Sequence, residues 1–300
     1  MQVAICIITR RRPEGLARLL HSLEEISVPE GVGVHVVVVE NDIPTDAPPP
    51  GCSLPLRHVF EPEPGIPAAR NRSLEIALEN PDTDAVAFLD DDETVDREWL
   101  AALCRGREAS GTAVTTGPAI PRFPTGSPAW AEASGVYQPP RYPTGTRRPW
   151  AFTHNTMIDA EPLRRGGFRF DEAMRHGGGS DKEFFRRIVD AGHEITWVDD
   201  AIAFEWYPIE RIGMGWVFRR SYRLGTNALH AEGLSGIRGR GTLLFRAGRF
   251  GIRGLLRGAA SIIHPSVAAA RACWDLGRAC GLVAGVLGRR YEEYAERHAG

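Results

Sequence analysis

Short apolar runs alternate with helix-like segments through the first third of this 300-residue chain. Val3–Thr9 and Val34–Val39 are apolar along almost their whole length and rich in β-branched residues, which is typical of strands covered on both faces. Between them, Pro13 suits the first turn of a helix, and four leucines within residues 16–23 recur with helical spacing. The alternation predicts an α/β fold with a doubly wound, mostly parallel sheet.

The same patterns predict elements further along the chain. Strands are expected at 56–60, 84–89, 113–117, 152–158, 194–198 and 201–205, the last two completing the sheet, and helices at about 67–80, 96–109 and 181–191. Residues 118–149 break the pattern, with many Pro and Gly residues and interspersed aromatics. Loops this long are usually functional or disordered, and the aromatic residues favour an ordered binding loop.

The last third of the chain is helical in pattern and rich in arginine, with helices expected at 212–229, 243–263 and 267–287. Residues 211–300 contain 15 Arg, no Lys and 5 acids, a charge of +10, and the net charge of −2 leaves −12 for residues 1–210. We therefore expect two parts, a domain at 1–210 and a helical region at 211–300. The arginines of the region 211–300 stand among apolar residues, and this pattern has two interpretations. The helices could have a solvated arginine face, or they could form a surface that lies on an anionic membrane.

Composition restricts the class of protein. The five cysteines form no CxxC pair, which predicts reduced thiols and a cytoplasmic location. No window reaches the roughly 18 uncharged apolar residues of a transmembrane helix, so we expect any attachment to the inner face of the cell membrane to be peripheral. The near-neutral charge and the acidic first two-thirds argue against a nucleic-acid partner.

Four acids, Asp90-Asp91-Asp92-Glu93, directly follow the buried strand expected at 84–89. Adjacent carboxylates repel one another, and a hard divalent cation such as Mg²⁺ or Mn²⁺ supplies a compact counter-charge that retains sites for phosphate oxygens. The alternative is an acidic turn that caps the following helix. Because open α/β sheets bind ligands at the ends of their strands, the position favours a metal site with Asp90 and Asp92 as ligands.

Further polar groups follow the neighbouring strands. Thr9 and Arg11 come after the first strand, Glu40-Asn41-Asp42 after the second, and Arg70 lies early in the helix that Pro67 opens. Glu40, Asn41 or Asp42 could accept hydrogen bonds from a base or ribose, and the Arg70 guanidinium could bind a diphosphate or the acid cluster. Together these groups predict a crevice for a nucleotide. The sequence has no Walker A or GxGxxG motif, which excludes the corresponding ATPases and oxidoreductases.

Three glycines lead into Ser180-Asp181-Lys182-Glu183 at the start of the helix expected at 181–191. Ser180 or Asp181 could cap this helix, with Glu183 in its first turn. Asp181 could instead act as a general base, although a capping carboxylate has a lowered pKa and is a weaker base. Candidate contacts to an acceptor substrate precede this helix in the chain: Trp150, His154 and Asn155.

The polar motifs, in their order along the chain, resemble those of family 2 glycosyltransferases, in particular the bacterial branch of succinoglycan-type exopolysaccharide enzymes. The matching segments are Ile5–Arg11, Val36–Asp42, Gly65–Asn71, Phe88–Glu93 and Phe170–Phe185. The resemblance covers about residues 1–225 and implies a GT-A catalytic domain at 1–210. It also implies a nucleotide-diphosphate-sugar donor, a divalent metal and an inverting mechanism. The acceptor hydroxyl is left open among a lipid-linked saccharide, a small molecule such as a secondary metabolite, and a protein.

The resemblance further implies roles for individual residues. Thr9, Glu40, Asn41 and Arg70 would bind the nucleotide, with Arg11, Asp42 and Asp91 beside them. Asp90 would face the ribose or the metal, Asp92 would ligate the metal, and Asp181 would be the catalytic base. Ser180 stands where the family commonly has Glu, which leaves Glu183 as the candidate supporting carboxylate, and Glu40-Asn41 replaces a frequent Asp-Asp.

Two other functions remain open on the sequence alone. A metal-dependent nucleotidyltransferase also uses acids beside a nucleotide, but it would need a glycine-rich phosphate loop that the N-terminal segment lacks. A non-catalytic module could instead use its arginine-rich C-terminal region to bind anionic lipid or nucleic acid.

Overall fold

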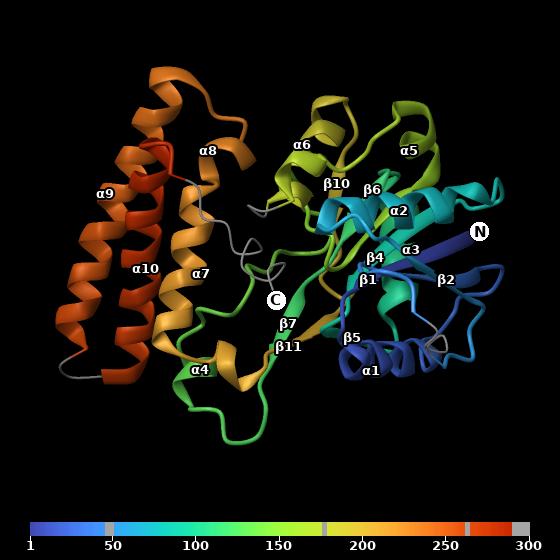
Figure 1. Ribbon diagram of the computed structural model, residues 1–300, viewed down its shortest axis with the longest axis horizontal. Coiled ribbons are helices and arrows are strands. Elements are labelled where there is room, and N and C mark those ends of the chain that lie inside the picture. Colours follow the sequence, from blue (N-terminus) through green and yellow to red (C-terminus); the bar gives the residue numbers. More distant parts are fainter. Residues whose placement is uncertain (46–50, 176–178, 262–264, 290–300) are drawn as a thin grey trace. The chain divides into compact units, whose positions relative to one another are not determined.

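The computed structural model describes residues 1–45, 51–175, 179–261 and 265–289 (Figure 1). The chain forms two compact units. The first comprises Met1–Ile120, Pro139–Arg175 and Ser180–Trp206, and the second includes Pro121–Gln138 and the chain from Tyr207 onward. The division at residue 210 stays a proposal about domain organisation, and it differs from these units by leaving 121–138 in the first part.

An eight-stranded sheet forms the centre of the first unit, in the order β3-β2-β1-β4-β9-β6-β10-β8. Its strands are β1 (Gln2–Thr9), β2 (Gly33–Glu40), β3 (Leu56–Phe60), β4 (Ala85–Asp90), β6 (Val114–Thr116), β8 (Arg147–Arg148), β9 (Thr156–Asp159) and β10 (Ile195–Trp197). Strands β1 to β4 are parallel to one another, as are β6 and β10, whereas β9 runs antiparallel to both β4 and β6. The predicted doubly wound, mostly parallel sheet is confirmed.

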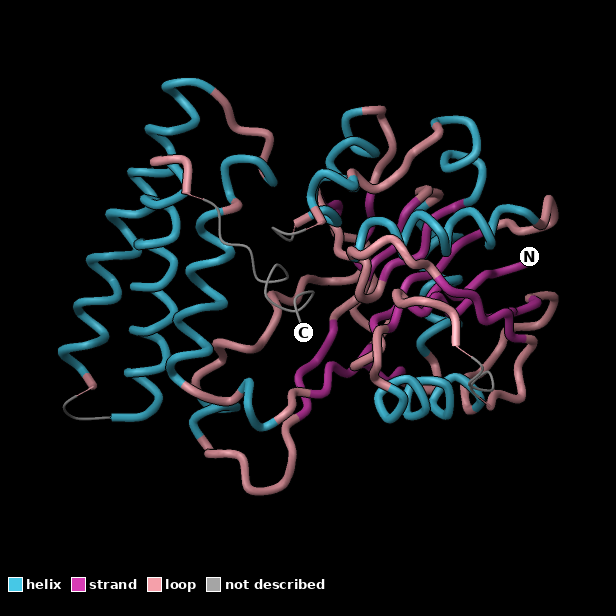
Figure 2. Tube along the Cα trace, in the orientation of Figure 1, coloured by secondary structure: helices cyan, strands magenta, loops and turns pink. Residues whose placement is uncertain are grey.

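Helices cover both faces of this sheet because successive side chains of a strand point to opposite sides (Figure 2). Val3, Ile5 and Ile7 of β1 pack with α1 (Pro13–Glu24) and α3 (Trp99–Ser110). Ala4 and Cys6 face the other way and share a core with α2 (Ile66–Glu79), α5 (Ala160–Gly166) and α6 (Ser180–Asp190). The strand ends are therefore fixed between two apolar layers.

A second, three-stranded sheet has the order β5-β11-β7, formed by β5 (Glu93–Val95), β11 (Ala203–Trp206) and β7 (Ala119–Arg122). The prediction that the strand near 201–205 completes the main sheet is thus wrong. Its partner is β5, which the sequence did not reveal because strands rarely begin with an acid from a charged run. Residues 118–149 also contain the short α4 (Trp130–Ala133) and β8.

The second unit is helical, with α7 (Met214–Thr226), α8 (Ala228–Ala231), α9 (Gly236–Ala260) and α10 (Pro265–Val286). Helix α10 packs against both α7 and α9 and lies between them (Figure 1). Two short 3₁₀ helices, η1 (Glu172–Met174) and η2 (Ile209–Arg211), complete the described elements. Within the described ranges, none of the helices combines the length and apolar character that crossing a membrane requires.

Candidate active site

The ends of three strands meet at one edge of the main sheet, as the sequence predicts. Thr9 at the end of β1 is paired in register with Glu40 at the end of β2, and Ile8 is paired with Asp90 at the end of β4. Because these strands are parallel, the polar residues that follow them leave the sheet on the same side.

Asp91 is anchored inside the edge rather than presented to a ligand. Its side chain accepts hydrogen bonds from Thr9 Oγ1 at 2.8 Å and from Arg12 Nη1 at 2.8 Å. Burial raises the pKa of Asp91, and the charge of Arg12 opposes that shift. Arg12 also donates to Asp92 at 3.2 Å, so one guanidinium joins two of the four acids. Sequence reasoning missed Arg12 because nothing in a run of three arginines indicates which one turns inward.

Asp90 is the more accessible acid of the turn, with its side chain 36% exposed. The Arg70 guanidinium donates to Asp90 at 3.3 Å and lies over the Phe170 ring, 5.6 Å from its centroid. The Arg70 side chain is buried, so packing fixes the direction of its charge. This pair offers a cation and a carboxylate side by side at the predicted nucleotide edge.

Glu93 lies in β5 and is almost fully buried, so it belongs to a strand rather than to an exposed acidic turn. Its Oε2 accepts the Asp90 N–H at 2.9 Å, and Oε1 has no hydrogen-bond partner. Burial raises its pKa well above the ordinary value, and the nearby Asp90 and Asp92 carboxylates raise it further. Burial therefore favours the protonated form of Glu93. The capping alternative also fails, because α3 begins only at Trp99, without a side-chain cap.

The residues after β2 divide between two tasks. Glu40 accepts the Arg11 backbone N–H at 2.7 Å, and the Arg11 guanidinium pairs with Asp42 and lowers the pKa of that carboxyl. Asn41 instead holds the loop that leads to α2. Its amide donates to the carbonyls of Glu61 and Glu63 at 2.9 and 2.7 Å, and its Oδ1 accepts from Gly65 N–H at 2.9 Å. The Asn41 side chain therefore positions this loop, and its contact to a base stays a prediction.

Asp181 lies in the first turn of α6, where its Oδ1 accepts the Lys182 backbone N–H at 2.8 Å. Glu183 is buried and pairs with Arg187 of the same helix, at 2.8 and 3.0 Å. Its charge is thus paired within α6, and its assignment as the carboxylate that supports Asp181 stays a prediction.

Stacked rings connect α6 to the end of β4. Phe184 stacks on Phe170 with centroids 4.1 Å apart, and Phe170 meets the edge of Phe88 at 6.0 Å. Phe88 precedes Asp90 by two residues, and Asp181 precedes Phe184 by about one helical turn. Asp90 and Asp181 therefore each lie a few residues along the chain from a ring of the same aromatic cluster.

The three candidate acceptor contacts have different environments. Asn155 is completely buried: its amide accepts from Trp99 Nε1 at 2.7 Å and donates to the carbonyls of Pro118 and Ala201. Asn155 has φ of 140°, which interrupts the extended backbone expected at 152–158, so β9 begins at Thr156 rather than at 152. The prediction that Asn155 contacts an acceptor is wrong.

Trp150 and His154 remain partly exposed and belong to one row of rings. Phe152 lies between them, 5.0 Å from Trp150 and 5.2 Å from His154. Since Thr156 pairs with Phe88 in an antiparallel register, the chain before Thr156 leaves the sheet at the edge where Asp90 lies. The row Trp150–Phe152–His154 therefore runs from this edge toward Arg148, whose guanidinium lies 4.6 Å from the Trp150 ring centroid.

The acid turn fits a divalent metal that binds together with a diphosphate. Among the residues that the structure describes, no three His, Cys, Asp or Glu side chains are arranged to hold a metal alone. Mg²⁺ is commonly held by one or two carboxylates plus substrate phosphates. Asp92 and Asp90 match that donor set, with one Asp92 oxygen shared with Arg12.

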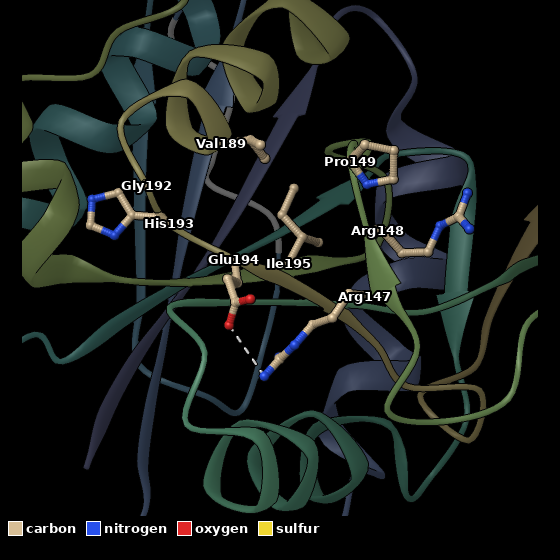
Figure 3. Close-up of a pocket in the computed structure, with 8 residues that line it drawn as sticks. All are labelled: Arg147, Arg148, Pro149, Val189, Gly192, His193, Glu194 and Ile195. Carbon is tan, nitrogen blue, oxygen red and sulfur yellow. Dashed lines mark ion pairs between the residues drawn. The ribbon is translucent and has the colours of Figure 1, made fainter.

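A cavity of about 330 Å³ lies at a different place, beside β8 and the start of β10 (Figure 3). Arg147 and Glu194 form an ion pair of 3.3 Å at its wall. Because β10 runs parallel to the strands that end at the acid turn, its beginning lies at the opposite edge of the sheet. The cavity is therefore separate from the candidate active site.

Comparison with known proteins decides the family. Residues 4–166 match the model of glycosyl transferase family 2. The succinoglycan biosynthesis protein ExoM of Rhizobium meliloti (strain 1021) is 30% identical over 312 residues, covering 99% of this chain and 97% of ExoM. The chain belongs to glycosyl transferase family 2. It is a glycosyltransferase, rather than a nucleotidyltransferase or a non-catalytic module, and it has relatives in polysaccharide biosynthesis.

Solved structures show the same fold for this family 2 glycosyltransferase. Residues 1–349 of S. aureus TarS in complex with UDP superpose with a TM-score of 0.52 at 14% identity, covering 97% of this chain and 93% of that one. The TarS complex with UDP-GlcNAc gives a TM-score of 0.53 with the same coverage. The likeness supports the GT-A fold predicted from the sequence.

Proposed function

We propose that this glycosyltransferase moves a sugar from a nucleotide-diphosphate-sugar donor to an acceptor hydroxyl, with inversion and with a divalent metal. The pathway would be bacterial polysaccharide, glycolipid or secondary-metabolite synthesis. One observation carries the proposal: the register of β1, β2 and β4 brings Thr9, Glu40 and Asp90 to one edge. A nucleotide needs hydrogen-bond acceptors and a cationic partner for its phosphates, and this edge has both.

On the donor side, Asp92 and Asp90 would hold Mg²⁺ or Mn²⁺, and Glu40 would bind the nucleoside. When bound, the metal offsets the negative charge of the departing diphosphate. Arg70 and Arg12 contribute positive charge at the same place, and their pairs with Asp90 and Asp92 keep them directed at it. Thr9 and Asp91 act indirectly, because their mutual hydrogen bond holds the turn in position.

On the acceptor side, Asp181 would take the proton from the attacking hydroxyl. The hydroxyl oxygen bonds to the anomeric carbon as the bond from that carbon to the diphosphate oxygen breaks, so a single displacement inverts the configuration. The row Trp150–Phe152–His154 supports an acceptor that carries a sugar or another flat apolar face. A lipid-linked saccharide and a small molecule both meet this requirement.

Donor binding and turnover can be tested separately. Because TarS was solved with UDP and UDP-GlcNAc, these are the first probes for a thermal-shift screen with Mn²⁺, followed by other nucleotide sugars. We expect Asp92→Asn to lose the metal-dependent shift, whereas the exposed control Asp82→Asn keeps it. Asp181→Asn should keep the shift and lose transfer by at least about 100-fold, the usual contribution of a general base.

The control for Asp181→Asn is Asp190→Asn, at the other end of the same helix, where the carboxylate pairs with Arg186. Undiminished transfer by Asp181→Asn would remove the base from the proposal. Retention of the anomeric configuration in the product, measured by NMR, would contradict the single displacement.

A further inference from the structure

Helix α9 carries large apolar side chains on its outer side. The exposed fractions are 91% for Ile237, 69% for Phe245, 64% for Ile252, 68% for Leu255 and 67% for Leu256. Their spacing returns them to one side of the helix, because seven or eight residues make about two turns. We call these five residues the α9 outer face. Contiguous exposed apolar side chains of this kind mark an interaction site on a soluble protein.

The opposite side of α9 is packed with smaller residues. Gly239, Ala247 and Gly254 are buried together with Leu243, and a Cβ on Gly254 would lie 2.8 Å from the Leu276 side chain of α10. This arrangement is inverted relative to an ordinary surface helix, which buries its large apolar residues and exposes polar ones. Packing on α10 therefore leaves the most hydrophobic part of α9 uncovered.

The charge on α9 is entirely positive. The helix has six arginines and no acid. Arg246 pairs with Glu232, and Arg253 and Arg257 pair with Asp275. Arg238 and Arg249 are exposed on the same helix and lie at one border of the apolar face, given the spacing of 100° per residue. The α9 outer face is thus apolar at its centre and cationic along its border.

We propose that the α9 outer face lies on an anionic lipid surface. Headgroups would offset the bordering arginines, and the acyl boundary would cover the apolar side chains. A second copy of this chain fits the face less well, because a two-fold contact would bring two rows of arginines together, and like charges facing each other oppose association. The inference is independent of the catalytic proposal, since no residue of α9 belongs to the acid turn or to α6.

Co-sedimentation with vesicles tests the proposal directly. We expect the full-length protein to bind vesicles of phosphatidylglycerol and phosphatidylcholine, to bind pure phosphatidylcholine at least tenfold more weakly, and to lose binding as salt screens the charges. The double variant Leu255→Ser/Leu256→Ser should weaken binding at least tenfold, given the free energy of burying two such side chains. Arg238→Gln and Arg249→Gln should each weaken binding about fivefold.

A matched pair of variants gives the control. Ile252 on the α9 outer face and Ile43 in the first unit are 64% and 65% exposed, and each is replaced by Ser. Ile43→Ser should bind vesicles like the unchanged protein, and Ile252→Ser should not. Equal losses in both variants would overturn the proposal, as would no binding by the unchanged protein. Sedimentation velocity tests the alternative. If the unchanged protein self-associates, Leu255→Ser/Leu256→Ser abolishes that self-association and no vesicle binding is seen, then the face binds a second copy and the proposal is overturned. Circular dichroism checks that each variant is folded.

Discussion

At the scale of single residues, burial gives adjacent acids different properties. Asp90 is half-open to solvent and pairs with Arg70, whereas Asp91 is buried and held by Thr9 and Arg12. Glu93, two residues after Asp91, is buried without a hydrogen-bond partner for its Oε1, and burial raises its pKa. A run of like residues in the sequence therefore contains a ligand candidate, a structural anchor and a buried acid with a raised pKa. The anchor and the buried acid each lead to a prediction.

Glu93→Gln should remove a pH dependence of stability. The pKa of Glu93 is raised in the folded state, so its favourable contribution exists at low pH and is lost as pH rises through the folded pKa. The penalty grows by about 1.4 kcal/mol per pH unit between the unfolded pKa and the folded pKa, and it is constant above the folded pKa. We expect the free energy of unfolding, measured with urea from pH 6 to 9, to fall less in Glu93→Gln than in the unchanged protein. Parallel curves would show that Glu93 is ionised.

Arg12→Gln should destabilise the protein by about 1–3 kcal/mol at pH 7, because the buried Asp91 carboxylate loses its charged partner. The pKa of Asp91, already raised by burial, should rise further without Arg12. The penalty is therefore largest above the folded pKa of Asp91 and shrinks as the pH is lowered. Urea unfolding at pH 5 and pH 8 measures this difference, with the exposed Arg165→Gln as a control. An equal penalty at both pH values would contradict the role given to the pair.

At the scale of elements, backbone approach rather than side-chain size decides how helices pack in the second unit. A Cβ on Gly277 of α10 would lie 2.5 Å from the Phe218 carbonyl oxygen of α7, and one on Gly285 would lie 2.6 Å from the Thr226 carbonyl oxygen. Gly281, midway between them, meets the Tyr222 carbonyl oxygen, so glycines at a spacing of four residues form the contact surface. The loop before α2 shows the same dependence on backbone groups, since Asn41 holds it through three backbone hydrogen bonds.

Gly277→Ala should therefore reduce the free energy of unfolding by about 1–3 kcal/mol, the usual cost of overpacking. Gly248→Ala is the matched control in the neighbouring helix α9, where a Cβ would meet nothing within 4 Å. Because alanine is the better helix former, this control should stabilise by up to about 1 kcal/mol. Thermal unfolding followed by circular dichroism separates the two signs. A stabilising Gly277→Ala would show that α7 and α10 are less closely packed.

Asn41→Asp should weaken donor binding without touching the donor. An ionised carboxylate at this position would face the carbonyls of Glu61 and Glu63, which now accept from the Asn41 amide. Each lost hydrogen bond to a buried group costs about 1–3 kcal/mol, so the loop that leads to α2 and Arg70 should loosen. Titration with a nucleoside diphosphate and Mn²⁺ measures the affinity. Unchanged affinity and unchanged protease sensitivity of residues 61–65 would contradict the positioning role.

At the scale of the whole molecule, charge is divided along the chain. Residues 1–210 carry −12 and contain the candidate active site, whereas residues 211–300 carry +10. An acidic part of the chain repels a diphosphate unless cations lie at the binding site. Arg12, Arg70 and the proposed metal would supply those cations. The basic part suits attraction to an anionic surface.

Removal of the metal should lower the melting temperature of the donor-bound protein and leave that of the free protein unchanged. At about 100 times the dissociation constant, a ligand stabilises by about 2.7 kcal/mol, which corresponds to about 3–8 °C in melting temperature for a protein of this size. We expect this shift with a nucleoside diphosphate and Mn²⁺, and its loss with EDTA. EDTA alone should leave the melting temperature unchanged. A shift that survives EDTA would contradict metal-assisted binding.

Local patterns in the sequence are enough to predict the doubly wound sheet and the edge at which the polar residues gather. Continuous apolar runs and helical leucine spacing are local patterns, and in parallel strands they fix which residues end together. Thr9, Glu40, Asp90 and Arg70 could therefore be assigned to one edge without a structure.

Which of these side chains are available for chemistry depends on contacts that form only in the folded chain. Arg12 pairs with a buried acid, whereas the preceding arginine pairs with a partly exposed one. Asn155 is buried whereas His154 is partly exposed, and Glu93 is buried whereas Asp92 is partly exposed. These differences arise from contacts with distant segments, which no local pattern encodes. The same is true of α9, whose spacing predicts an amphipathic helix but not that its small residues face inward. Burial and pairing depend on which surfaces meet, and that is a property of the folded chain.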